Sequence, residues 1–237
     1  MNLIAIALGT VPDVETGRRL HDLGELSDKD AAKVLYHRRK QETGYSEALR
    51  PNQQRIAALS LVREGDNGPE LVSHSWQDAD EAAVLDVLLA GVHGLSHLVS
   101  WGSEPLPVIG YRALKHDRHL SPLLQSGIMR DLQAELAQGQ ASAAAPLHEV
   151  AHLLGLPGVG DQPCDVWEAM LAGQTDVVQA ELDLQALHVY LIALRWARIT
   201  HQRPAAQIEA AEAALRAHLA ERSEPHLQQF LARWSGA

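Results

Sequence analysis

Apolar residues in roughly the first hundred positions form short continuous runs, whereas those further along the chain recur at helical intervals. A short apolar run bounded by turn residues is typical of a buried strand. Four segments predict strands in this way: residues 3–8, 55–63, 70–76 and 98–101. The turn sequence at residues 65–68 (GDNG) joins the second and third of them, so these two are expected to form a β-hairpin.

Helical spacing predicts most of the other elements. They are residues 26–42, 80–92, 106–115, 128–137, 147–154, 166–172, 177–200, 207–221 and 225–234. Residues 138–145 are low in complexity and predict a flexible connection. Strands followed by helices indicate a single α/β domain over residues 1–237, with a sheet-rich part at 1–125 and a mostly helical part at 126–237.

The composition is that of a globular chain with an excess of acid. Of 237 residues, 30 are Asp or Glu and 20 are Lys or Arg, which gives a net charge of −10. Nucleic-acid binding would therefore need a local basic patch. One cysteine, Cys164, excludes an internal disulfide and a zinc site built from several cysteines. No uninterrupted apolar run reaches the ~18 residues that span a bilayer, and no basic signal-peptide region is present, so a cytoplasmic protein is expected.

A possible metal motif occurs at residues 148–152 (HEVAH). On a helix this spacing places His148 and His152 on one face, with Glu149 beside them. Catalytic zinc takes three protein ligands, and the third His of the extended motif would fall at Gly158. We therefore interpret the segment as an amphipathic helix, and zinc binding by the two histidines is the alternative.

A series of short motifs along almost the whole chain carries a family resemblance. They are residues 10–20 (TVPDVETGRRL), 26–30 (LSDKD), 98–101 (LVSW), 106–109 (LPVI), 111–114 (YRAL), 153–158 (LLGLPG), 166–167 (VW), 190–195 (YLIALR) and 223–227 (SEPHL). In this order they resemble predicted 3′–5′ exonucleases that are similar to the proofreading domain of family-B DNA polymerases, in the DEDD superfamily. The resemblance implies an α/β, ribonuclease H-like fold, in which helices flank a mixed β-sheet and the C-terminal portion is helical.

The resemblance also assigns the metal-ligand positions. Exonucleases of this superfamily hold two Mg²⁺ or Mn²⁺ ions with four carboxylates, and the matching positions are Ala7, Gly9, Pro105 and Gln185. None of the four residues carries a negative charge, and two divalent cations about 4 Å apart need charged oxygen ligands. The resemblance therefore implies no catalytic residue and no cofactor. The expected function is that of a catalytically degenerate, exonuclease-like protein that binds nucleic acid or acts as a scaffold in DNA repair or replication.

Two alternatives remain open. An active exonuclease could hold Mg²⁺ or Mn²⁺ with relocated carboxylates, for which Asp13, Glu15, Asp131 and Asp183 are the candidates. We favour an acidic pair at a helix start for the first two and a solvent-facing charge for Asp183. The other alternative is a protein-interaction subunit without affinity for nucleic acid.

Two basic clusters are candidates for phosphate contacts. The first contains Arg38, Arg39 and Lys40, and the second contains Arg112 and Lys115. They predict binding of single-stranded or end-containing DNA. The alternatives are a solvated helix face for the clusters and a structural role for Arg112. A protein partner in repair or replication is the other expected interaction.

Overall fold

The computed structural model describes residues 2–78, 80–92, 96–121, 123–124, 128–158 and 164–234, and its strands form one sheet in the order β3-β2-β1-β4-β5. The strands are β1 (Asn2–Pro12), β2 (Gln54–Gly65), β3 (Gly68–Ser75), β4 (Ser96–Ser100) and β5 (Met129–Asp131). β2 is antiparallel to β1 and to β3, whereas β4 is parallel to β1 and to β5. The mixed sheet that the resemblance implies is therefore confirmed.

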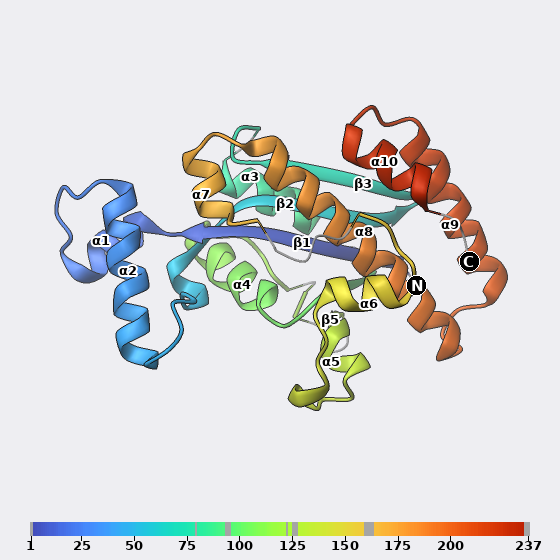
Figure 1. Ribbon diagram of the computed structural model, residues 1–237, viewed down its shortest axis with the longest axis horizontal. Coiled ribbons are helices and arrows are strands. Elements are labelled where there is room, and N and C mark those ends of the chain that lie inside the picture. The colour runs from blue at the N-terminus through green and yellow to red at the C-terminus, as the bar shows by residue number, and fades with distance from the viewer. Residues whose placement is uncertain are drawn as a thin grey trace.

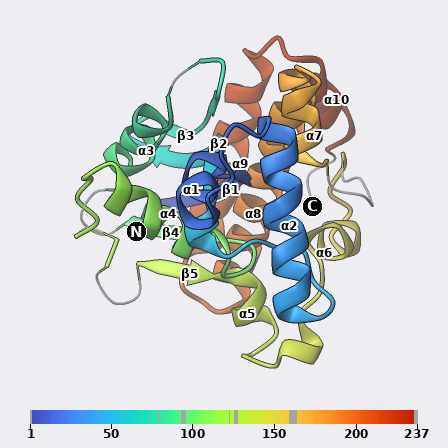
Figure 2. The same cartoon turned by 90° about the vertical axis from the view of Figure 1, so that its left-hand side faces the viewer.

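Helices cover both faces of this sheet (Figure 1). They are α1 (Val14–His21), α2 (Asp28–Thr43), α3 (Glu81–Ala90), α4 (Pro105–Lys115), α5 (Leu132–Leu136), α6 (Leu147–Leu153), α7 (Val166–Leu171), α8 (Thr175–Ile199), α9 (Ala205–Ala220) and α10 (Pro225–Arg233), with the 3-10 helices η1 (Pro51–Gln53) and η2 (Ala141–Ala143) between them. Figure 2 shows α3 and α4 on one side of the strands and α7, α8 and α10 on the other. The fold is thus a sheet between two helical layers.

The alternation of side chains along β1 divides the core in two. Ile4 and Ile6 pack with apolar residues of α3 and α4, whereas Ala5 and Ala7 pack with those of α8. Successive side chains of a strand point to opposite faces, so a continuous apolar run is what a strand covered on both faces requires. The small alanines face α8, which packs against β1, β2 and β3.

β1 is much longer than its parallel neighbour. Its pairing with β2 extends to Pro12, with a register shift between Gly9 and Thr10, but its pairing with β4 stops at Ala5. The second half of β1 therefore lacks a strand on its β4 side. It leads directly into α1 and α2, which Figure 1 shows at one end of the molecule.

α8 is the longest helix, and it forms the centre of one core cluster. By length and composition this helix could cross a membrane, although its apolar residues do not form one uninterrupted run. In this structure 67% of its apolar window is buried inside the protein. The buried core helix of a globular protein passes the same test of length and composition, so the feature is weak evidence for a membrane span.

Two segments differ from the sequence-based expectation. Residues 128–137 are not one helix, because β5 occupies Met129–Asp131 and the Asp131 side chain then caps α5 by accepting from the Ala134 N–H. The second difference is β1, which continues to Pro12 where we expected a strand at residues 3–8 closed by a turn. The helix start expected at Asp13 is confirmed, because α1 begins directly after β1. Asp13 caps it by accepting from the Thr16 N–H.

Candidate functional site

A cavity of about 410 Å³ lies beside the free edge of β1, where β4 has ended. We call it the edge cavity. Its lining residues come from β1, the start of β2, the loop after β4, α4, α5, α6 and α8: Ile6, Ala7, Leu8, Thr10, Gln54, Trp101, Gly102, Ser103, Glu104, Pro105, Val108, Gln133, Leu147, Gln185 and Val189. Three of the positions that the resemblance assigns to metal ligands, Ala7, Pro105 and Gln185, are among them. The fold therefore brings these three positions, far apart in sequence, around one cavity.

Neutral groups dominate the polar lining of the edge cavity. Gln185 Nε2 donates to Glu181 Oε1 at 2.9 Å, and Thr10 Oγ1 donates to Gln54 Oε1 at 2.6 Å. The indole nitrogen of Trp101 is buried and has no hydrogen-bond partner in the structure as described. These amide, hydroxyl and indole groups can form hydrogen bonds but supply no net charge.

The fourth assigned position, Gly9, does not face the edge cavity. A Cβ atom built on Gly9 would lie 3.1 Å from Leu182 Cδ1 and 3.3 Å from Val166 Cγ1, which is closer than most real Cβ contacts. Two apolar side chains, one from α8 and one from α7, therefore fill the space that a side chain at position 9 would enter. A carboxylate there would need both to move.

Two paired divalent cations do not fit the donors of the edge cavity. Glu104, an exposed residue, is the one carboxylate among the described residues that line it. Within the described ranges, no group of three His, Cys, Asp or Glu side chains could hold a metal ion. Two Mg²⁺ ions bring four positive charges, and they prefer charged oxygen ligands.

The candidate relocated carboxylates lie in different environments. Asp13 is buried at the start of α1, where Arg112 Nη1 and Lys115 Nζ lie 2.6 Å and 3.1 Å from Asp13 Oδ2. Burial alone would raise the pKa of Asp13, but the hydrogen bonds from Thr16, Arg112 and Lys115 together hold it well below its ordinary value. Its charge is therefore already compensated by the protein. Glu15 is exposed and pairs with Arg19 and Lys115.

Asp183 is a buried side chain, which corrects the expectation of a solvent-facing charge. Its Oδ1 accepts from the hydroxyls of Ser60 and Ser73 and from Gln179 Nε2, and His226 Nε2 lies 2.9 Å from its Oδ2. A helical position is buried or exposed according to what packs on it, and here β2, β3 and α10 surround this face of α8.

Asp131 lies beside the edge cavity. Its Oδ1 accepts from the Gly102 N–H and the Ala134 N–H, each at 3.1 Å, and thereby joins the loop after β4 to α5. The four candidate carboxylates are thus divided among the start of α1, the start of α5 and the core beneath α8, and they do not form one metal site.

The family comparison agrees with this architecture. A family model described as "Predicted 3'-5' exonuclease related to the exonuclease domain of PolB" matches residues 46–234, most of the chain. The chain belongs to this exonuclease-related family. No curated protein and no solved structure matches it significantly. The strand order and the flanking helices are consistent with the ribonuclease H-like fold expected of the family.

The matched residues include Pro105 and Gln185 but not the first strand. The assignment of Ala7 and Gly9 to the family's first two ligand positions therefore depends on the sequence motif that follows them. Ala7 lies on the central strand and is close to Gln185 and Pro105 in the lining of the edge cavity.

The basic residues proposed to contact phosphate occupy unequal positions. Arg38 is exposed on α2 and forms no ion pair among the residues that the structure describes. Arg39 pairs with Glu42 at 3.2 Å, and Lys40 pairs with Glu47 at 2.8 Å. Arg38 is therefore the member of this cluster whose charge is most available to a ligand.

The second basic cluster has a buried member and a partly exposed one. Arg112 is 2% exposed and forms ion pairs with both Asp13 and Glu81. Arg112 therefore has the structural role that was the alternative to phosphate contact, and its guanidinium is not on the surface. The Lys115 side chain is 30% exposed, so its ammonium group can still reach a ligand.

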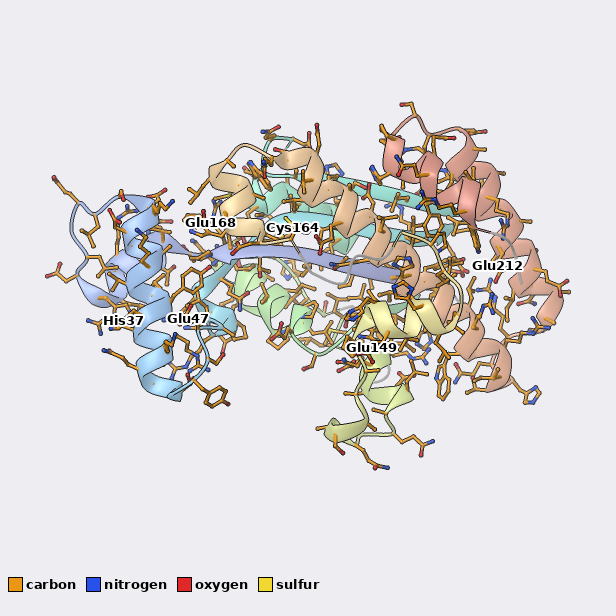
Figure 3. All side chains as sticks on the ribbon, viewed as in Figure 1. His37, Glu47, Glu149, Cys164, Glu168 and Glu212 are labelled. Atoms are coloured by element: carbon orange, nitrogen blue, oxygen red, sulfur yellow. The ribbon has the colours of Figure 1, made fainter. Side chains whose placement is uncertain are left out.

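The HEVAH motif lies on α6, whose Ala151 is buried in the core cluster around α8. Figure 3 shows Glu149 projecting from this helix and Cys164 before α7. His148 is half-buried and His152 is exposed. Neither belongs to a group of three potential metal ligands in the described part of the chain.

Burial raises the pKa of the Cys164 thiol, with nearby Glu181 and Asp165 adding to the effect, so this cysteine is not an activated nucleophile.

Sequence reasoning missed Glu104. It lines the edge cavity beside Pro105, and its position two residues before the LPVI motif was the available signal. Arg55, which lies near the first basic cluster in sequence but was not chosen as a phosphate contact, lines a second cavity described below.

Proposed function

We propose that this protein is a catalytically degenerate member of the exonuclease-related family, which binds single-stranded or end-containing DNA without cutting it. Its role would be that of a nucleic-acid-binding or scaffold protein in DNA repair or replication. The observation that carries the proposal is the lining of the edge cavity, which brings together Ala7, Pro105 and Gln185, the residues that the resemblance assigns to metal-ligand positions.

Repulsion between two metal ions is one reason to expect that this protein does not cleave DNA. Paired divalent ions are held about 4 Å apart only when surrounding anionic oxygens offset their mutual repulsion. Glu104 supplies one such group, and Gln185 supplies a neutral amide already bonded to Glu181. At position 9 the packing of Leu182 and Val166 leaves no room for another ligand.

The relocated carboxylates offer little support for an active enzyme. The charge of Asp13 is matched by Arg112 and Lys115, and that of Asp183 is satisfied by hydroxyl, amide and imidazole groups. A metal ion at either place would have to displace these existing partners. The two carboxylates also lie on separate elements, one before α1 and the other within α8.

Binding of DNA without metal needs cations that are not already paired. Arg38 on α2 is such a group. Lys115 on α4 is already paired with Asp13 and Glu15, but it is partly exposed and keeps one N–H for a phosphate. Each phosphate neutralised by a cation releases counterions. On a chain with a net charge of −10, these local cations also have to offset long-range repulsion of the phosphate backbone. We therefore expect moderate binding that weakens steeply with salt.

A paired assay tests cleavage and binding on the same preparation. Labelled single-stranded DNA is incubated with the full chain and Mn²⁺, and binding is followed separately by fluorescence anisotropy at several salt concentrations. We expect no shortening of the strand, salt-dependent binding, and weaker binding by Arg38→Gln. Shortening that disappears in Glu104→Gln would overturn the proposal in favour of an active exonuclease. The absence of both cleavage and binding would favour the protein-interaction subunit instead.

A further inference from the structure

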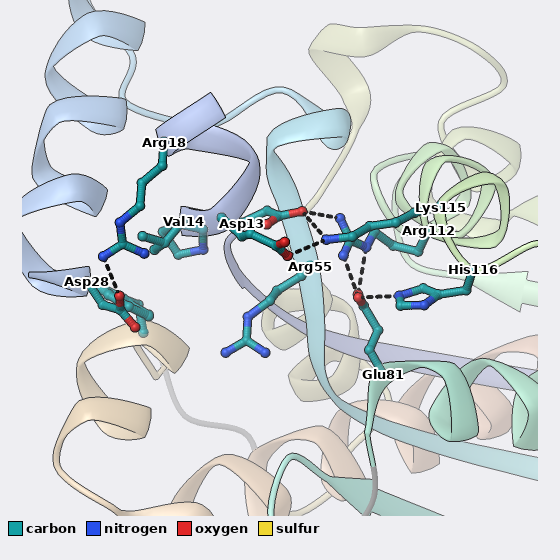
Figure 4. A pocket seen from close by; sticks show the side chains of 12 residues that line it. Asp13, Val14, Arg18, Asp28, Arg55, Glu81, Arg112, Lys115 and His116 are labelled. Carbon is teal, nitrogen blue, oxygen red and sulfur yellow. Dashed lines mark hydrogen bonds and ion pairs between the residues drawn. The ribbon is translucent and has the colours of Figure 1, made fainter. Parts of the chain in front are cut away.

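A second cavity, of about 330 Å³, lies at the end of β1 where the chain enters α1 (Figure 4). We call it the terminal cavity. Its lining contains ionisable side chains from α2, β2, α3 and the regions of α1 and α4: Asp13, Glu15, Arg18, Asp28, Arg55, Glu81, Arg112, Lys115 and His116, with Trp167 of α7 also present. Four of these are acids and four are Lys or Arg, so the lining is close to neutral on a strongly acidic protein.

The buried acids of the terminal cavity have partners within the protein. Both oxygens of Asp13 accept hydrogen bonds, Oδ1 from Thr16 N and Oδ2 from Thr16 Oγ1, Arg112 Nη1 and Lys115 Nζ. Glu81 Oε1 accepts from Arg112 Nε at 2.7 Å, and its Oε2 accepts from Arg112 Nη2. These carboxylates therefore have little remaining capacity to bind or to repel a further charged group.

The remaining acids are also paired. Figure 4 shows Asp28 joined to Arg18, whose Nη2 lies 2.7 Å from Asp28 Oδ1. His116 Nε2 lies 2.8 Å from Glu81 Oε2, and the exposed Glu15 pairs with Arg19 outside the cavity. The cationic groups of the cavity are thus matched to carboxylates, with one exception.

Arg55 is that exception. It comes from β2, is partly buried, and projects among the paired groups in Figure 4 with no partner drawn to it. Its hydrogen bond in the structure goes to Met170 Sδ at 3.7 Å, and no carboxylate within the described residues forms an ion pair with it. A guanidinium has five N–H donors, and a thioether is a weak acceptor. Most of the hydrogen-bonding capacity of Arg55 is therefore unused.

We propose that the terminal cavity binds a phosphate group of a nucleic-acid strand through Arg55, an inference that rests on the proposed function. The planar fork of a guanidinium matches two phosphate oxygens, and such charge-assisted bonds are stronger than neutral ones. Lys115, which keeps one N–H beyond its bonds to Asp13 and Glu15, supplies a second donor on the same wall. The two cavities follow one another along the outer half of β1, because Thr10 and Gln54 line the edge cavity whereas Pro12 and Arg55 line the terminal cavity.

The first experiment measures binding of a fluorescent 12-nucleotide single strand to the full chain over a range of salt. Arg55→Gln is compared with Arg198→Gln, a matched loss of one exposed cation at the far end of α8. We expect Arg55→Gln to weaken binding about tenfold and to lower the slope of log K against log salt by about 0.7. The Arg198→Gln variant should bind within about twofold of wild type. Arg55→Lys should keep the slope, because it keeps the charge.

The second experiment uses small probes and does not depend on binding of a strand. Thymidine 5′-monophosphate, inorganic phosphate and thymidine are titrated while the Arg55 side-chain Nε–H is followed by nuclear magnetic resonance. We expect the monophosphate and phosphate to shift this signal and thymidine to leave it unchanged. Equal shifts with thymidine, or none with either phosphate, would overturn the phosphate site.

The two experiments separate the inference from the proposed function. If Arg55→Gln binds the DNA strand as tightly as wild type, the phosphate site is wrong but the proposed function stands. If the wild-type chain binds no DNA strand, the proposed function is wrong. The chemical-shift change caused by thymidine 5′-monophosphate then shows whether the cavity binds phosphate on its own. Unfolding curves of each variant check that a loss of binding is not a loss of fold.

Discussion

Asp13 and Arg112 are 99 residues apart in sequence, yet Arg112 Nη1 lies 2.6 Å from Asp13 Oδ2 and both side chains are almost fully buried. Arg112 simultaneously binds Glu81, so one guanidinium joins the end of β1, the start of α3 and the end of α4. A buried ion pair costs much desolvation to form, but removal of one partner leaves the other as an isolated buried charge.

The first prediction concerns this buried cation. Arg112→Met should lower the free energy of unfolding by about 3–5 kcal/mol, because Asp13 and Glu81 would lose their main partner. Arg38→Met, at an exposed position, should change it by less than about 0.5 kcal/mol. Urea unfolding followed by circular dichroism measures both. A loss below about 1 kcal/mol in Arg112→Met would contradict the structural role of the network.

The second prediction concerns pH. Burial lowers the pKa of His188 from 6.5 to about 4, and the neutral ring shares a hydrogen bond with the carbonyl of Pro157. The unfolded chain takes up a proton near pH 6.5 that the folded chain accepts only near pH 4, so folding stability falls as the pH falls through this interval. This lowering of the His188 pKa corresponds to a loss of about 3 kcal/mol in the free energy of unfolding at low pH.

The variant His188→Gln removes this titration while retaining an amide that can donate to Pro157. Between pH 7 and pH 4 it should therefore lose about 3 kcal/mol less stability than the wild type. His37→Gln, at an exposed position on α2 (Figure 3), is the control and should follow the wild-type curve. If wild type and His188→Gln lost the same stability between pH 7 and pH 4, His188 would not be the buried group whose protonation destabilises the folded chain.

The third prediction uses two glycines that differ in their surroundings. Gly9→Ala should destabilise the protein by about 1–3 kcal/mol, since the new methyl group would meet Leu182 and Val166. Gly110→Ala, inside α4 with nothing within 4 Å of the added Cβ, should stabilise it by about 0.5–1 kcal/mol. Thermal unfolding of both variants measures the difference. Tolerance of alanine at position 9 would mean that a side chain fits there after all.

The fourth prediction separates a structural from a metal-binding role for Asp183. Asp183→Asn should lower the free energy of unfolding by about 1–3 kcal/mol, because an amide cannot accept from all of the donors around it. Glu209→Gln, an exposed acid on α9, should be nearly neutral. A variant as stable as wild type that had lost bound Mn²⁺ would instead identify Asp183 as a metal ligand.

The sheet could be predicted from the sequence because its strands are short apolar runs with a strong turn between two of them. β5 could not, because three residues with intermediate burial carry no periodic pattern. Those residues form a strand because they pair in parallel with β4, and this pairing depends on the tertiary fold. The start of α1 was visible in Asp13, but its polar sequence gave no apolar face to define its length.

Residues that line the edge cavity could be located from the sequence where a motif fixed a position on an element. Position 185 on α8 and position 105 at the start of α4 follow from neighbouring motifs, and the structure brings them to one cavity with Ala7. Burial could not be predicted in the same way. Charge alone does not reveal that Arg112 and Asp183 are inside the protein, because their partners come from distant segments.

The unequal lengths of β1 and β4 have a mechanical consequence. Beyond Ala5 the central strand pairs, among the described strands, with β2 on one side only, and it then continues into α1. Residues of that half form a wall of both cavities. We therefore expect a displacement of the α1–α2 end that moves this half of β1 to change the shape of both cavities.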